Sequence, residues 1–108
     1  MQTTVDSMYQ AVSEIQKLPT SAILCQLAEE ASELAQAALK LARILDGVNP
    51  TPIHRDDAID HLNEEIADIQ VCVTCLNGFI DRSAIDSIQI TKLLRWSERL
   101  RESGGTNV

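Results

Sequence analysis

The sequence has few residues that break helices and few aromatic side chains. Its 108 residues include 3 Pro, 4 Gly and one each of Trp, Tyr and Phe, while hydrophobic residues make up 44%. Pro and Gly fall mostly where structural elements would be joined, and Ala, Leu, Ile and Val dominate the apolar share. This composition is typical of an all-α protein. We expect one domain over residues 1–108, with frayed ends at 1–4 and 102–108.

Long apolar runs and an export signal are also missing. No apolar stretch approaches the ~20 residues that span a bilayer, and no basic-then-apolar segment opens the chain. The three Cys, an odd number, favour free thiols over a disulfide framework. We therefore expect a cytoplasmic protein that does not enter a membrane.

Positive charge is scarce. Nine Lys and Arg face sixteen Asp and Glu, which gives a net charge of −7. Duplex nucleic acid and anionic membrane surfaces need a basic footprint, so both are disfavoured as partners. An anionic small molecule stays possible if bound metal ions supply the positive charge.

Hydrophobic periodicity predicts four helices. They cover about residues 5–18, from after Thr20-Ser21 to 45, from Asp56 or Asp57 to 80, and from after Ser83 to 100. Thr20 or Ser21 is predicted as an N-cap, as is Ser83, for which Asp86 would complete a capping box. Short joints between long helices predict an antiparallel bundle.

The second predicted helix carries two apolar stripes. The first contains a carboxylate and comprises Ile23, Leu27, Glu30, Leu34, Ala37, Leu41 and Ile44. The second is mostly Ala and comprises Leu24, Ala28, Ala31, Ala35, Ala38, Ala42 and Leu45. One neighbour cannot cover so wide a surface, so we expect part of the core to lie between subunits. The third predicted helix has one stripe: Ile59, Leu62, Ile66, Ile69, Val73, Leu76 and Ile80.

Two pairs of carboxylates lie at the edges of these stripes. Residues three apart on a helix share a face, so Glu30 points with Glu33, and Glu65 points with Asp68. Glu30 lies inside its stripe, and the pair on the third helix lies one position beside its own. If the two helices pack together, four carboxylates meet in a partly dry groove.

Such a groove has three ways to relieve the repulsion. Some carboxylates take up protons, some pair with Lys or Arg, or divalent cations bind between them. Oxygen-only ligands suit Mg²⁺, with Mn²⁺ as a possible substitute. The alternative is that all four are solvated surface charges. A di-iron site fails on the residues, because no Glu here is followed by His three residues later.

Cysteine and histidine offer weaker candidates. Cys72 and Cys75 form C-x-x-C deep inside a predicted helix, where buried small side chains are a better account than redox or zinc chemistry. His61 precedes Glu65 by one turn and either touches a ligand there or lies on the surface.

The carboxylate pattern resembles a known family. "EEASEL" (29–34) followed by "EEIAD" (64–68) is similar to the ExxE…ExxD signature of MazG-type, all-α nucleoside triphosphate pyrophosphohydrolases. "EEASELAQAALKLAR" resembles the first motif helix of the short, single-domain members, and "ITKLLRWSERL" resembles their closing basic helix. The likeness covers about residues 20–101.

The resemblance implies an α-helical fold with a four-helix core completed by dimerisation, as a homodimer or homotetramer. It implies Mg²⁺-dependent hydrolysis of a nucleoside triphosphate to the monophosphate and pyrophosphate, in clearing unwanted nucleotides. By position, the metal ligands would be Glu30, Glu33, Glu65 and Asp68. Glu29 would hold or deprotonate the attacking water.

Basic residues would face the pyrophosphate. Lys92 and Arg95 share one face of the last predicted helix, and Lys40 lies beyond Glu33 on the same side. Each could instead lie on the surface over apolar neighbours. The Tyr-His that follows the last acid in the phosphoribosyl-ATP branch is replaced here by Ile69-Gln70, which disfavours that substrate.

Two other functions stay open. One is a catalytically inactive helical module that binds a protein partner. The other is the same chemistry on a different phosphoanhydride substrate.

Overall fold

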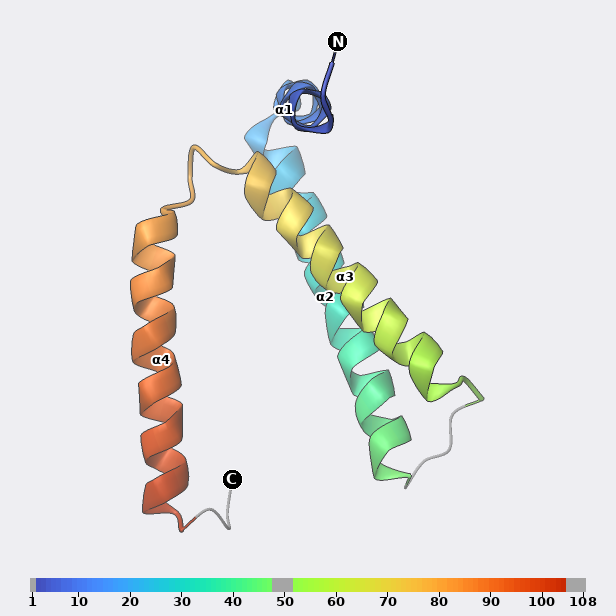
Figure 1. Ribbon diagram of the computed structural model, residues 1–108, viewed down its shortest axis with the longest axis vertical. Helices are drawn as coiled ribbons and strands as arrows, with labels where there is room; N and C mark the ends of the chain where they lie inside the picture. The colour runs from blue at the N-terminus through green and yellow to red at the C-terminus, as the bar shows by residue number, and fades with distance from the viewer. Residues whose placement is uncertain (1, 48–51, 105–108) are drawn as a thin grey trace. The chain divides into compact units, whose positions relative to one another are not determined.

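The computed structural model describes residues 2–47 and 52–104, and these are all helical or irregular, without a strand. The helices are α1 (Thr4–Ile15), α2 (Thr20–Asp46), α3 (Arg55–Cys75) and α4 (Arg82–Glu102) (Figure 1). The all-α prediction is thereby confirmed. None of the described helices combines the length and apolar content needed to cross a bilayer.

The chain divides into two compact units. The first contains α1, α2 and α3 and ends at Asn77, and the second begins at Gly78 and contains α4. The single domain over 1–108, the antiparallel bundle of four helices and the dimer stay predictions.

α1 begins with a capping box. Thr3 Oγ1 accepts a hydrogen bond from Asp6 N at 3.1 Å, and Thr3 N donates to Asp6 Oδ2 at 3.2 Å. The hydrogen bond from the Thr3 backbone is the main reason why the pKa of Asp6 lies below its ordinary value. These bonds satisfy donors that a helix start otherwise leaves unpaired.

α1 ends at Ile15, three residues before the predicted end. Lys17 N and Leu18 N donate to carbonyls three residues back, which tightens the chain into a turn before Pro19. Gln16 Nε2 donates to Cys75 O at 3.2 Å and to Asn77 Oδ1 at 2.9 Å. The end of α1 is therefore attached to the end of α3.

α2 and α3 lie side by side and run in opposite directions (Figure 1). The first predicted stripe of α2 is the face that contacts α3, since each of its seven residues is buried or half-buried. The second, Ala-rich stripe is exposed throughout in the α1–α3 unit. The core of this unit therefore lies along one face of α2, as predicted.

The ends of α2 differ slightly from the prediction. Thr20 and Ser21 are inside the helix, and Pro19 stands at the N-cap without a side-chain cap. Pro19 has no backbone N–H, so it adds no unpaired donor at the helix start. Gly47 closes the helix with φ 68°, a conformation that favours Gly, and its N–H donates to Arg43 O at 3.0 Å.

α3 packs with a face that shares half of its residues with the predicted stripe. Its contact row is Ala58, Leu62, Glu65, Ile69, Cys72 and Leu76, all buried or half-buried. Ile66, placed in the core by the sequence, is 40% exposed. The small side chains of Ala58 and Cys72 allow α2 to approach closely, and Ile66 lies beside the contact. Glu65 therefore lies within the contact row of α3, and not one position beside it as predicted.

The helix ends of α3 and α4 also need correction. α3 begins at Arg55, close to the predicted start, but ends at Cys75 rather than at 80, before the polar and flexible pair Asn77-Gly78. α4 is capped by Asp81, whose Oδ1 accepts from Ala84 N at 3.0 Å, and not by Ser83. The Asp86 capping box was therefore wrong by two positions.

Close packing of α2 on α3 predicts that enlarging Ala37 will destabilise the fold. Ala37 is 1% exposed on the contact face, so Ala37→Leu should lower the free energy of unfolding by about 1–3 kcal/mol through overpacking. The matched control is Ala22→Leu at an exposed position of α2, expected to change it by less than about 0.5 kcal/mol. Urea unfolding followed by circular dichroism measures both. Equal losses would contradict the packing described.

Candidate metal centre

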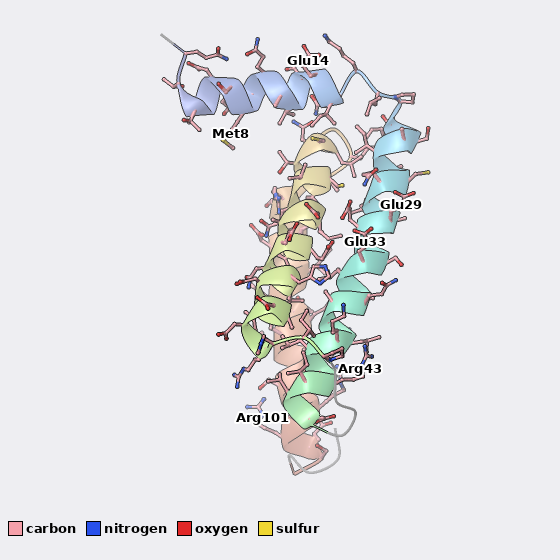
Figure 2. The ribbon with its side chains drawn as sticks, turned by 90° about the vertical axis from the view of Figure 1, so that its right-hand side faces the viewer. Met8, Glu14, Glu29, Glu33, Arg43 and Arg101 are labelled. Atoms are coloured by element: carbon pink, nitrogen blue, oxygen red, sulfur yellow. The ribbon has the colours of Figure 1, made fainter. Side chains whose placement is uncertain are left out.

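Three carboxylates from α2 and α3 come together where the two helices pack. Glu30, Glu33 and Glu65 each offer one carboxylate oxygen, and these three oxygens lie within 4.8 Å of one another. Glu30 and Glu33 are one turn apart on α2, and Glu65 reaches them from α3. Figure 2 shows Glu33 on α2 one turn after Glu29. The sequence predicted all three as ligands and predicted that the two helices would bring them together.

The group is buried on one side and open on the other. Glu65 is 6% exposed, Glu30 is half-buried and Glu33 is exposed. A ligand bound by the three carboxylates would therefore contact the packed helices at Glu65 and be accessible to solvent at Glu33.

One oxygen of each buried Glu is held by a neighbour four residues earlier. Gln26 Nε2 donates to Glu30 Oε1 at 2.8 Å. His61 Nε2 lies 3.1 Å from Glu65 Oε1. The two arrangements are alike, because each uses a polar side chain one turn upstream on the same helix.

The other oxygen of each buried Glu is left without a partner. Glu30 Oε2 and Glu65 Oε2 are both inaccessible to solvent, and no hydrogen bond reaches either from the described residues. A buried oxygen without a donor carries its full cost of desolvation. Unpaired polar atoms of this kind are uncommon in folded proteins and call for a ligand or a proton.

Pairing with Lys or Arg does not neutralise the group. In the described part of the chain, the only cationic partner of its three carboxylates within ion-pair distance is His61, which is charged only when protonated. Of the three ways to relieve the repulsion, protonation and cation binding are left. Three oxygen ligands on two rigid helices suit a hard divalent cation such as Mg²⁺ or Mn²⁺.

Asp68 lies next to the group but does not belong to it. It is half-buried on α3, one turn after Glu65, and its charge contributes to the raised pKa of Cys72, as does that of Glu30. Asp has one methylene fewer than Glu, so its carboxylate stays closer to its own helix than that of Glu33 does. The predicted fourth ligand is thus near the site without joining the three oxygens.

The Cys72 thiol lies on the contact row of α3, two turns after Glu65. Burial is the largest cause that raises its pKa above the ordinary value, and the charges of Glu30, Cys75 and Asp68 raise it further. A raised pKa keeps the thiol protonated near neutral pH, where it is a poor nucleophile and a poor metal ligand. Cys72 and Cys75 are free and buried, as expected of small core residues.

The remaining predicted residues have no direct place in the group. Glu29 is exposed on α2, beside Glu30 in sequence, and Lys40 is half-buried further along α2. Lys92 and Arg95 line one side of α4 together with Thr91, in the second unit of the chain. Their roles toward a substrate stay predictions.

Sequence reasoning missed Gln26 and left His61 undecided. A signal for both is present in the chain, because residues 26–41 and 61–76 match at a constant offset. In each segment a hydrogen-bonding side chain is followed one turn later by the second Glu of Glu-Glu and, three residues on, by another acid. The contact rows of α2 and α3 follow this match, so the two helices present like residues to each other.

Three comparisons with known proteins found no match to this chain. No family model, no curated protein and no solved structure matches it. The features that bear on function are therefore the three carboxylates, their burial and the unpaired oxygens of Glu30 and Glu65.

Proposed function

We propose that this protein is a Mg²⁺-dependent hydrolase of nucleoside triphosphates that releases the monophosphate and pyrophosphate. The observation that carries the proposal is the pair of buried, unpartnered oxygens, Glu30 Oε2 and Glu65 Oε2, in a group of three carboxylates within 4.8 Å. The pattern EExxE…EExxD, which resembles the signature of MazG-type pyrophosphohydrolases, supports the substrate class.

The charge of the site supports a substrate that arrives with a cation. Three carboxylates repel a polyphosphate, and the protein as a whole carries −7. Mg²⁺ held by Glu30, Glu33 and Glu65 would neutralise phosphate charge and acidify a nearby water. Phosphates of a substrate would reach it from the exposed side at Glu33.

The chain's own residues then have distinct tasks. Glu30, Glu33 and Glu65 hold the cation, with Asp68 one turn away as a further ligand. Glu29, exposed next to Glu30, accepts the proton of a water whose oxygen attacks the α-phosphorus. The bond from the α-phosphorus to the bridging oxygen breaks, and pyrophosphate leaves with that oxygen. Lys40, further along α2, is the candidate within this unit for stabilising its charge.

The cellular part of the proposal is the removal of surplus or non-standard nucleotides, among them dNTPs, by a cytoplasmic homodimer or homotetramer. The exposed Ala-rich face of α2 is compatible with a subunit contact, since small side chains let another helix approach closely. The same exposed face is what a non-enzymatic partner-binding module would use, so the two functions need separate tests.

A panel of substrates tests the reaction class. With Mg²⁺ and micromolar enzyme, we expect pyrophosphate release from at least one of the common NTPs and dNTPs, and none in excess EDTA. Quantification of the nucleoside monophosphate and pyrophosphate by anion-exchange chromatography measures it with and without EDTA. Absence of release from every member of the panel would refute hydrolysis of nucleoside triphosphates.

Glu33→Gln tests the ligand assignment. We expect kcat/KM to fall by more than about 100-fold, because loss of an outer partner of a metal ligand already costs about 10–100-fold. The fold should survive, with unchanged or greater stability in EDTA, because one like charge is removed from the group. Glu14→Gln is the matched control, since Glu14 is an exposed residue of α1 outside the site (Figure 2). Full activity of Glu33→Gln would exclude Glu33 as a ligand.

Thermal melting separates the enzyme from the partner-binding module. We expect Mg²⁺ together with a non-hydrolysable triphosphate to raise the Tm, because ligands that bind only the native state stabilise it. Differential scanning fluorimetry with each component alone and with both provides the comparison. A Tm that is unchanged by Mg²⁺ and by the triphosphate, alone and together, would favour the non-enzymatic module.

A further inference from the structure

We infer that Gln26 and His61 are positioning residues that turn the unpaired oxygens of Glu30 and Glu65 toward a shared cation. This inference rests on the proposed metal site and deepens it. Gln26 Nε2 donates to Glu30 Oε1 at 2.8 Å, and His61 Nε2 lies 3.1 Å from Glu65 Oε1. In both cases Oε1 is the oxygen held and Oε2 is the buried oxygen left over.

A glutamate in this group needs such a restraint. Its side chain has three rotatable bonds, and like charges lie within 4.8 Å. Without a donor, repulsion favours rotamers that turn the carboxylate away from its neighbours, which removes it from the site. A hydrogen bond to Oε1 fixes the plane of the carboxylate and thereby the direction of Oε2.

The chemistry of the two donors suits a cation site. Gln26 is neutral, so it orients Glu30 without supplying positive charge that would compete with the metal. An ionised carboxylate only accepts hydrogen bonds, so His61 must carry a proton on Nε2 when Glu65 is ionised. The side chain of His61 is 38% exposed and that of Glu65 is 8% exposed. His61 therefore lies between the buried carboxylate of Glu65 and the solvent.

Loss of the donor should have a different effect here than in an ordinary pair of hydrogen-bonded side chains on a helix surface. Polar pairs four residues apart on an exposed helix contribute only slightly to stability. Here Glu65 is buried and Glu30 is half-buried at the contact of α2 and α3, and the second oxygen of each is inaccessible to solvent and lacks a partner. Removing a donor should therefore lower metal affinity, because the carboxylate is no longer held in place.

Mn²⁺ binding to the full chain tests the inference. Free Mn²⁺ is measured by electron paramagnetic resonance for the wild type, Gln26→Leu and His61→Leu. We expect the Kd for Mn²⁺ to rise by about 10-fold or more in each variant, the range found for partners of metal ligands. Their Tm values in EDTA measure separately what the lost hydrogen bond costs the metal-free protein.

Two further variants distinguish orientation from mere packing. His61→Gln places on α3 the donor that α2 already uses, so it should restore Mn²⁺ affinity to within about 3-fold of the wild type. Asn63→Leu is the matched control: Asn63 is an exposed α3 residue whose Nδ2 donates to Ile59 O at 2.8 Å, and its loss should leave Mn²⁺ affinity unchanged.

The outcomes are separable. If the wild type binds Mn²⁺ and both Leu variants bind it equally well, the positioning role is refuted while the proposed metal site stands. If His61→Gln binds as weakly as His61→Leu, hydrogen-bond donation is not the role of His61 and the inference is wrong. If the wild type itself binds no Mn²⁺, the proposed function fails. Should one Leu variant not fold, the other carries the same test.

Discussion

The structure of this protein depends on the contact between α2 and α3, and that contact includes like charges. Glu30 and Glu65 occupy equivalent positions in two heptad-like rows where apolar side chains normally pack. Removing an ion from water costs several kcal/mol even after the protein relaxes. The Leu and Ile residues before and after each Glu hold the helices together despite this cost. The fold therefore tolerates a charged group whose repulsion a divalent cation would relieve.

Two packed helices hold the backbone positions of these three carboxylates at a fixed spacing. Glu30 and Glu33 keep their spacing because both belong to one turn of α2, and Glu65 is fixed by the packing of Ala58 and Cys72 on the same row of α3. A carboxylate on a loop would move away with its backbone, whereas the backbone positions of these three are held by the two helices, and only side-chain rotation can separate them. Metal binding and the stability of the helix pair are therefore linked.

Much of this arrangement was predictable from the sequence. The row on α2, including Glu30, was correct because no competing row of large apolar residues lies beside it. On α3 the predicted stripe was correct at Leu62, Ile69 and Leu76, but it placed Ile66 in the contact where Glu65 lies, because Ile66 is the more hydrophobic of the two. Close packing selects small side chains, which hydrophobicity alone does not favour. The hydrogen bond of Gln26 depends on side-chain rotamers, and no pattern of residue types determines these.

The central claim is that the two buried glutamates are retained for a cation and not for stability. The most direct test is the free energy of unfolding of the wild type and of Glu30→Leu/Glu65→Leu, each in EDTA and in Mg²⁺. We expect the double variant to be more stable than the wild type in EDTA, by about 1–4 kcal/mol, the gain found when buried ionic groups are replaced by apolar ones. Mg²⁺ should stabilise only the wild type. A double variant that is less stable than the wild type in EDTA, together with a wild type that does not respond to Mg²⁺, would contradict the claim.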